Sequence, residues 1–414
     1  MEPTFLNKRS AFLLGIISLL CVSCVTNSLP PAPKTQSNAY VLNPSFRVYK
    51  YHPDSLRVYF EFDNKEILYV RNGYEDNFRS NVVIQWHLGA EATEDVWDGS
   101  LEYGNIGDGK SFKDLVGHFD LAMPAEQNIL TLQLIDRNRK SSTIRYFQID
   151  PNNNYGAILL REKNSRKPIV SNEILTQDTL LFENPRDIEI EFNEIQFKYL
   201  HPLPVFYGKK ELEDQFHLAN ITTVVPSDSL FVVSDTTQHV LIRSNDGDVL
   251  YSFSRIPLLK ENGGDGASFG LPLRYISNRE EYAALQASNF SQAALENFWL
   301  NLAGSKIKAK KLSGVYYDRV KFSNNQFGTF KPGSLTDRGM IFIAFGKPTN
   351  VYRRSTHETW VYGDENNMMA LNFTFYLETI PPFGKDFILS RSPSYKNLWF
   401  RAVETWRSGR YTTF

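Results

Sequence analysis

The sequence predicts a multidomain, β-rich protein: two tandem antiparallel β-sandwich (Ig-like) modules followed by an α+β C-terminal domain. Three observations support this fold class. The chain has 414 residues, enough for two to three domains. Aromatic side chains make up 14% of it, and rings pack well on a pleated, half-buried surface. The hydrophobic period is two over the first two thirds of the chain and helical in the last third.

Residues 39–150 are predicted to form the first β-sandwich module. Alternating apolar and polar residues indicate strands at 55–63, 81–88, 128–136 and 142–150. Turn-forming sequences such as "RNGYED" and "DRNRK" separate them. No helical pattern lies between these strands, which favours an antiparallel sandwich.

Residues 151–272 repeat this pattern and are predicted to form the second module. Strands are expected at 157–162, 187–197, 229–235, 239–244 and 249–258. The sequence "NDGD" at 245–248 is typical of a hairpin turn, since Asn and Gly accept a positive φ. The Gly-rich stretch 261–270 marks the boundary to the next domain.

Residues 273–414 change to a helical period. Asn278 and Glu281 have the spacing of a capping box. Three helices are expected at 278–289, 291–304 and 307–327, and a fourth at 392–409. The apolar run "MIFIAF" at 340–345, bounded by glycines, is interpreted as a buried strand, with neighbouring strands at 358–363 and 370–378. This is the predicted α+β domain.

The N-terminus has the pattern of a targeting segment. Lys8 and Arg9 precede the apolar run 11–20, which has the length of a signal peptide and is short for a bilayer span. The sequence "CVSC" then resembles a bacterial lipobox, with Cys21 where Leu is usual and Cys24 as the lipidated residue. We therefore expect a signal peptide at 1–23, and the lipidated Cys with a Pro/Ser-rich tether at 24–38. A simple cleaved signal that yields a soluble periplasmic protein is the alternative.

Composition narrows the possible chemistry. The formal net charge is −1, so nothing in the overall charge favours nucleic acid as a partner. Both cysteines lie in the N-terminal segment, and the seven histidines lack the short spacing of a metal site. Loop sequences at 105–110 and 150–156 do not fit the phosphate-loop or calcium-loop patterns. No cofactor or metal is expected, and no catalytic constellation can be placed from spacing.

The stretch 331–348, "KPGSLTDRGMIFIAFGKP", carries the candidate site residues. Gly333 and Gly339 permit a tight corner, and Thr336 and Asp337 can accept backbone N–H bonds there. Either Arg338 or Arg319 is expected to pair with Asp337. On this interpretation the motif is a structural brace. The alternatives are a binding groove around it, or Asp337 as a general base with Arg338 holding an anionic or glycan substrate.

The C-terminal third resembles the GWxTD domain of envelope lipoproteins from Bacteroidota. Gly333, Thr336 and Asp337 match the naming motif, and Ser334 replaces its Trp. The resemblance is carried by the blocks 274–285, 295–299, 316–328, 333–348, 358–363 and 398–409. The lipidated N-terminus and the two β modules are also similar to the longer family members. The resemblance therefore implies fold and location, and no particular chemistry.

These observations favour a non-enzymatic envelope lipoprotein that acts as a protein-interaction or scaffolding module. Its partners would be the membrane, through the lipid anchor, and an envelope protein. Its location would be the periplasmic side of the outer membrane. The alternative is a glycan- or peptidoglycan-binding or processing protein with a site near the TDRG sequence. Two further patterns stay open. The lysines of 306–312 are a solvated helix face or a contact for an anionic surface, and the tryptophans belong to the core or to a glycan platform.

Overall fold

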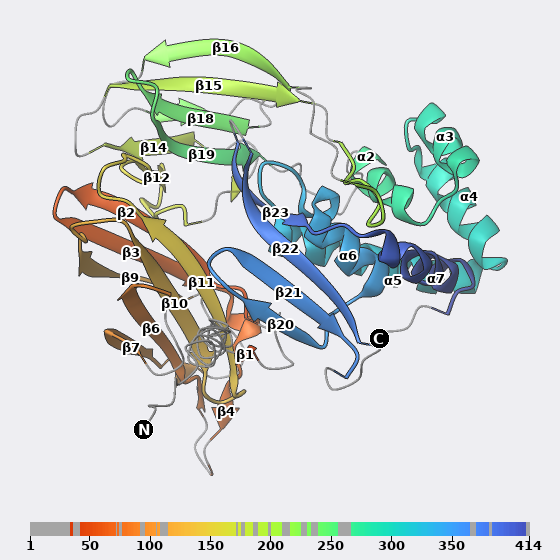
Figure 1. Cartoon of the computed structure of the whole chain (residues 1–414), viewed down its shortest axis with the longest axis horizontal. Helices are drawn as coiled ribbons and strands as arrows, with labels where there is room; N and C mark the ends of the chain where they lie inside the picture. Colours follow the sequence, from red (N-terminus) through yellow and green to blue (C-terminus); the bar gives the residue numbers. More distant parts are fainter. Residues whose placement is uncertain are drawn as a thin grey trace, which may run out of the picture. The chain divides into compact units, whose positions relative to one another are not determined.

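The first part of the chain is built of β-sheets and the last third is rich in helices, as Figure 1 shows for the computed structural model. The chain divides into two units, Met1–Ala32 and Pro33–Phe414. The signal peptide and Cys24 predicted above lie outside the described residues. The structure describes residues 34–35, 42–71, 73, 77–91, 96–104, 106–107, 115–170, 173–174, 179–184, 189–197, 200–208, 216–224, 230–232, 239–255, 266–364, 370–380 and 383–410.

Three antiparallel sheets come from the first β region. One has the order β2-β3-β9 and another the order β11-β10-β6-β7. A small third sheet has the order β4-β5-β8. The strands are β2 (Ser45–His52), β3 (Ser55–Phe62), β4 (Val70–Arg71), β5 (Phe78–Arg79), β6 (Val82–Gly89), β7 (Gly99–Tyr103), β8 (Ile106–Gly107), β9 (Leu115–Ala122), β10 (Asn128–Asp136) and β11 (Ser141–Ile149).

The two larger sheets of this region share their apolar side chains. Phe60 of β3 clusters with Ile84 of β6 and Leu134 of β10. Val58 of β3 clusters in the same way with Leu132 of β10. Period-two alternation therefore predicted these strands because one face of each sheet is buried.

The second β region contains two more sheets, of order β12-β14-β17 and β13-β19-β18-β15-β16. Their pairings are antiparallel except for β13 with β19. The strands are β12 (Leu159–Glu162), β13 (Glu173–Ile174), β14 (Thr179–Glu183), β15 (Ile190–Phe197), β16 (Phe216–Val224), β17 (Leu230–Val232), β18 (His239–Ser244) and β19 (Val249–Arg255).

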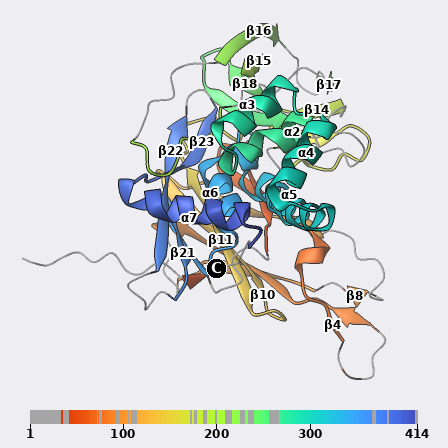
Figure 2. The ribbon, with the colours of Figure 1, turned by 90° about the vertical axis from the view of Figure 1, so that its right-hand side faces the viewer.

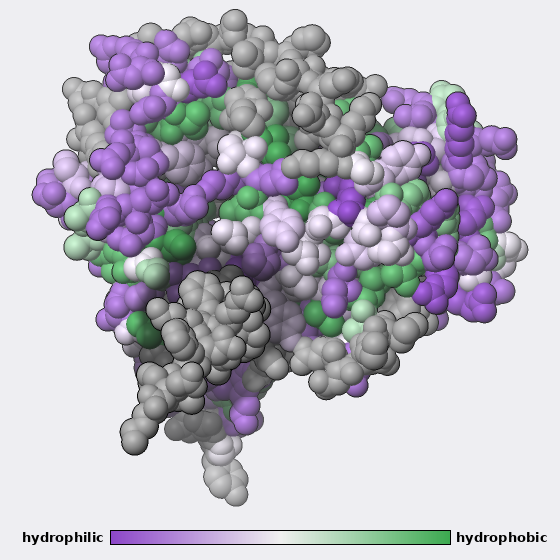
Figure 3. All heavy atoms as spheres, viewed as in Figure 1, coloured by the Kyte–Doolittle hydropathy of each residue, from purple (hydrophilic) through white to green (hydrophobic). Residues whose placement is uncertain are grey.

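The C-terminal region combines helices with a five-stranded sheet of order β1-β20-β21-β22-β23. Figure 2 turns its helices toward the viewer, and hydrophilic residues cover most of the right-hand edge in Figure 3, where these helices lie. The elements are β1 (Lys34–Thr35), α2 (Gly266–Gly270), η2 (Leu271–Tyr275), α3 (Arg279–Ala287), α4 (Gln292–Ala303), α5 (Lys306–Phe327), η3 (Gly333–Leu335), α6 (Asp337–Phe345), β20 (Asn350–Arg353), β21 (His357–Tyr362), β22 (Leu371–Ile380), β23 (Gly384–Leu389), η4 (Pro393–Tyr395) and α7 (Lys396–Arg407).

A single apolar cluster joins these helices to the sheet. It contains Tyr316 of α5, Ile341 of α6, Trp406 of α7 and Trp360 of β21, each at most 1% exposed. The cluster also includes Val205, from a segment of the second β region. No helix in the described part of the chain is long and apolar enough to cross a membrane.

The sequence predictions of a β-rich chain with a helical C-terminal region are confirmed. The capping box is present, since Asn278 accepts from the Glu281 amide and Glu281 accepts from the Asn278 amide. The interpretation of 340–345 as a buried strand is wrong, because these residues belong to α6. A short apolar run carries no period that separates a buried strand from a buried helix.

Candidate functional site

The motif stretch surrounds α6, a short helix enclosed by the C-terminal core. Eight of its nine residues are buried, and Arg338 is the exception. A helix this short is marginal alone and needs tertiary contacts and satisfied ends. The motif residues supply these contacts.

Thr336 caps the N-terminus of α6. Its backbone is extended, and its Oγ1 accepts a hydrogen bond of 3.1 Å from the Gly339 amide. The same hydroxyl donates to the Gly333 carbonyl oxygen at 2.7 Å. The side chain is fully buried. Both hydrogen-bonding capacities of Thr336 are therefore used within the motif, as in a helix N-cap.

Asp337 ties the start of α6 to the end of β23. Its Oδ2 accepts from the Leu389 amide at 2.7 Å and from Arg391 Nη1 at 3.0 Å, and its Oδ1 accepts from Arg391 Nη2 at 2.5 Å. The pairing of Asp337 with Arg338 or Arg319 predicted above is wrong. A bidentate pair fixes geometry in two directions, and a carboxylate in a first helical turn also suits the helix dipole.

Arg391 extends this contact to the second β region. Its Nη2 also donates to the Leu203 carbonyl oxygen at 3.1 Å, and the Ser392 amide donates to the Val205 carbonyl oxygen at 3.1 Å. His201 Nε2 lies 2.8 Å from the Leu271 carbonyl oxygen. Asp337 therefore orients an arginine that holds the segment 201–207 against the C-terminal core.

Close backbone approach explains the two motif glycines. A Cβ on Gly333 would lie 2.0 Å from the Ser323 carbonyl oxygen, and one on Gly339 would lie 1.8 Å from the Gly333 carbonyl oxygen. Real Cβ atoms essentially never come so near to backbone. Neither glycine is among those with a positive φ. The corner predicted at these positions is a contact between η3, α5 and α6 that leaves no room for a side chain.

Ser334, which stands where the family motif has Trp, is also enclosed. Its amide donates to Asn324 Oδ1 at 2.8 Å, and its carbonyl oxygen accepts from the Tyr275 hydroxyl at 2.7 Å. Ser334 is 2% exposed. Burial, and then the charge of Asp337, raises the pKa of Tyr275 well above its ordinary value, so this phenol is a donor.

Arg319 closes the other end of α6. Its Nη1 donates to the Ile343 carbonyl oxygen at 3.0 Å, one of the last carbonyls of the helix. Its guanidinium lies 4.8 Å from the Trp406 ring centroid, and burial lowers its pKa. A Cβ on Gly346 would lie 2.9 Å from this guanidinium. The arginine therefore satisfies the helix C-terminus from α5.

Arg338 forms no ion pair with Asp337 and joins a second buried charge cluster. Its Nη1 lies 3.7 Å from Glu358 Oε1, and its guanidinium lies 4.3 Å from the Phe387 ring centroid. Glu358 also accepts from Arg353 Nε at 3.0 Å and from Trp360 Nε1 at 3.2 Å. Burial alone would raise the pKa of Glu358, but the charges of Arg353 and Arg338 bring it below the ordinary value.

Asp386 shows the opposite behaviour in the same region. Burial raises its pKa, against the charges of Lys331 and Arg338. Its Oδ1 accepts from the Phe387 amide at 2.8 Å, and its Oδ2 has no hydrogen-bond partner among the described residues. Nothing in the local sequence marks this carboxylate, because the positive charges near it come from distant positions.

The geometry leaves the motif side chains little to offer a substrate. Asp337 is 5% exposed and Thr336 is fully buried. Two surface pockets lie on α5 and α7, and no motif residue lines either of them. Among the described residues no three His, Cys, Asp or Glu side chains are grouped as a metal site would need.

Four tryptophans of the C-terminal region belong to its core, which decides between the two interpretations left open above for these rings. The exposed fractions are 4% for Trp299, 0% for Trp360, 7% for Trp399 and 1% for Trp406. Aromatic neighbours surround them, such as Tyr316, which meets Trp406 edge-on at 5.1 Å. These rings are therefore not an exposed platform.

Residues 265–408 match the family model of the GWxTD domain. No curated protein matches this chain.

Proposed function

With residues 265–408 placing this chain among the GWxTD-domain-containing proteins, we propose that it is a non-enzymatic envelope lipoprotein and acts as a protein-interaction or scaffolding module. One observation carries the proposal: the polar side chains of the motif are used inside the fold. Asp337 accepts three hydrogen bonds from Leu389 and Arg391. A carboxylate so engaged, and 5% exposed, has no open face for a substrate.

The proposed anchor is a lipid on Cys24. A basic segment and an apolar run of signal-peptide length precede this residue. An acylated cysteine with more than one chain holds a protein on a membrane stably. We place the protein on the periplasmic side of the outer membrane. Cys24→Ala is expected to move it into the soluble fraction; a variant that stays with the membrane would disprove anchoring at this residue.

The proposed frame consists of two tandem β-sandwich modules, 39–150 and 151–272, followed by the α+β domain 273–414. Shared apolar clusters between facing sheets of the first β region support the first sandwich. In the second region, Leu160 and Phe182 of one sheet cluster with Phe192 and Ile242 of the other. Such modules suit a rigid spacer that presents the C-terminal domain to a partner.

Contacts between the first β region and the C-terminal sheet support this rigidity. Ser355 Oγ donates to Glu91 Oε2 at 2.8 Å, and the Tyr146 hydroxyl donates to the Arg353 carbonyl oxygen at 3.3 Å. Arg354 Nη1 lies 3.8 Å from Glu91 Oε1. Such fixed geometry suits a scaffold that presents a binding surface.

The experiment is chemical cross-linking of the native lipoprotein in its own envelope, followed by purification and mass spectrometry. The expected result is one or a few envelope proteins at reproducible stoichiometry, recovered equally with Gln286→Ala, an exposed position on α3, as a surface control. Binding of the purified protein to isolated peptidoglycan, lost in Asp337→Asn without a change in melting temperature, would instead favour the glycan-binding alternative and contradict the scaffold.

A further inference from the structure

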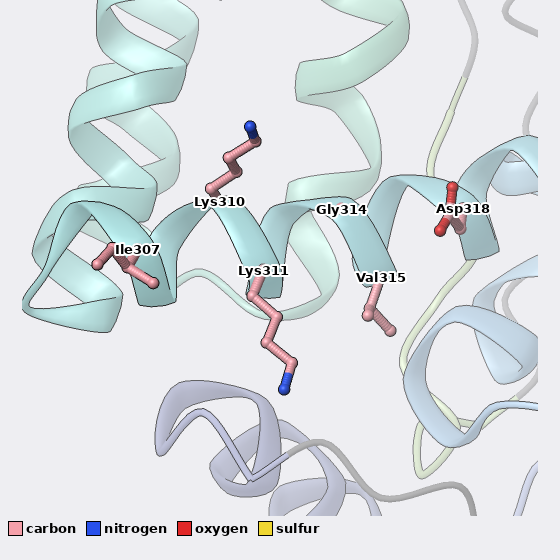
Figure 4. A pocket seen from close by; sticks show the side chains of 6 residues that line it. All are labelled: Ile307, Lys310, Lys311, Gly314, Val315 and Asp318. Atoms are coloured by element: carbon pink, nitrogen blue, oxygen red, sulfur yellow. The ribbon is translucent and has the colours of Figure 1, made fainter.

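The outer side of α5 carries features that the fold itself does not explain. One face of this helix is buried, through residues such as Leu312, Tyr316 and Val320. The opposite face lines a surface groove, shown in Figure 4. We call this groove the α5 outer face, and its residues are Ile307, Lys310, Lys311, Gly314, Val315 and Asp318.

Lysines crowd the first two turns of α5. Lys306, Lys308, Lys310 and Lys311 are all exposed, and none forms an ion pair among the described residues. The first turn contains no acidic residue. Cations near a helix N-terminus oppose the helix dipole and repel each other. This arrangement of lysines lowers the stability of the helix itself. A negatively charged ligand would offset the repulsion between them.

Gly314 lies in the middle of α5, where glycine is less favourable than alanine. A Cβ at this position would meet nothing within 4 Å. The fold therefore does not require this glycine, in contrast to Gly333 and Gly339. Glycine on a helix surface permits another backbone to come close. A lipid surface gains nothing from such a gap, whereas a protein segment crossing the helix does.

Ile307 provides an apolar contact next to the lysines. It is 86% exposed, the largest value among the large apolar side chains of the described residues. Figure 4 shows Lys310 and Lys311 projecting to opposite sides of α5, with Gly314 one turn further along. Asp318 closes the groove at its far end and would repel an acidic group there. The face therefore has a direction: positive and apolar at one end, negative at the other.

We propose that the α5 outer face binds an acidic segment of an envelope protein partner. The partner backbone crosses at Gly314, its apolar side chain packs on Ile307 and Val315, and its carboxylates face Lys310 and Lys311. Charge complementarity identifies the chemistry, and the open space at Gly314 favours a polypeptide over a lipid headgroup. The inference rests on the proposed scaffold function and assigns the partner-binding surface.

The test places a photo-reactive benzophenone amino acid at position 307 of the full-length lipoprotein, in the cells that make it. The expected product is a cross-link to one protein, mapped by mass spectrometry to a segment rich in Asp and Glu. Lys310→Glu together with Lys311→Glu should lower the yield about tenfold, because like charges then face each other. Charge reversal of the mapped acidic residues in the partner should restore it.

A second variant and a control make the result decisive. Gly314→Leu should lower the yield about tenfold by filling the gap, while the melting temperature of the protein stays unchanged or rises. The benzophenone at Gln286, exposed on α3, should give no such product.

Three outcomes would overturn the inference: cross-links to phospholipid, cross-links to a second copy of this chain, or an undiminished yield in the glutamate variant. If position 307 gives no product while envelope cross-linking still recovers a partner, the α5 assignment fails and the scaffold proposal stands. If neither recovers a protein, both fail.

Discussion

The surroundings of α6 and the outer face of α5 are adjacent in sequence and opposite in character. Around α6, Thr336, Asp337, Arg391 and Arg319 use their polar groups on one another or on backbone. On the α5 outer face, lysines and an isoleucine face solvent, and the described residues offer the lysines no ion pair. The motif residues therefore hold the C-terminal domain together internally. The side chains that are free to bind a partner lie instead on the α5 outer face, which contains no motif residue.

Removal of the Asp337 carboxylate is expected to have the largest effect. Asp337→Ala leaves Arg391, 10% exposed, as a buried cation without its partner. Loss of one member of a buried pair typically lowers the free energy of unfolding by about 3–5 kcal/mol. Urea denaturation of the unlipidated protein measures it, with Asp318→Ala on the outer face as a near-neutral control. An unchanged midpoint with lost partner recovery would move Asp337 from the frame to the binding surface.

Two glycine substitutions are expected to change the free energy of unfolding in opposite directions. Gly339→Ala places a Cβ against the Gly333 carbonyl and should lower the free energy of unfolding by about 2–3 kcal/mol. Gly314→Ala meets no neighbour and should raise it by up to about 1 kcal/mol, because alanine favours the helix. Thermal melts of both variants check this. Equal effects of the same sign would remove the contrast between the two regions.

Loss of the Thr336 cap is expected to be smaller. Thr336→Ala removes the acceptor for the Gly339 amide and should lower the free energy of unfolding by about 1 kcal/mol. Thr336→Ser keeps the hydroxyl and should retain most of the stability. Denaturation midpoints of the two variants distinguish the hydrogen bond from the methyl packing. A serine variant as weak as the alanine variant would show that packing, and not capping, matters here.

The two buried carboxylates near Arg338 should respond to pH with opposite signs. The pKa of Glu358 is lowered, so its stabilising contribution is present above its ordinary value of 4.5 and is lost as the pH falls through the lowered pKa. The pKa of Asp386 is raised, so its contribution is present below its ordinary value of 3.8 and is lost as the pH rises through the raised pKa.

At neutral pH, Glu358→Gln should therefore be less stable than the natural protein and Asp386→Asn more stable. Both differences should shrink toward acid pH. Unfolding free energies measured between pH 7 and pH 3 test the signs. A neutral-pH loss of stability in Asp386→Asn would mean that its charge is compensated by Lys331 and Arg338.

Local signals in the sequence predicted what depends on local physics. The capping box at Asn278 and the helical period of residues 291–304 predicted α3 and α4. The run 340–345 failed as a strand because it lacks a period, although Thr336 and Asp337 just before it are typical of a helix start. That N-terminal signal would have corrected the interpretation.

Partners distant in sequence were not predictable in the same way. Arg391 lies 54 positions after Asp337, and nothing in its own neighbourhood marks it as the partner. The sequence favours Arg338, which is next to Asp337, and Arg319, which lies on the preceding helix. Helix geometry directs Arg338 to Glu358 instead, and Arg319 reaches the other end of α6.

The packing of the segment 201–207 on the C-terminal core affects where a stable C-terminal fragment can begin and when this region can finish folding. The family match begins at residue 265, yet fully buried Val205 belongs to the same core as Trp406. A fragment that begins at residue 265 would lack Val205 and leave a cavity in the core. Arg391 would also lose its hydrogen bond to the Leu203 carbonyl oxygen. During synthesis, the segment 201–207 stays exposed until the chain has grown past residue 392. The C-terminal core can therefore be completed only when its last residues pack against this earlier segment.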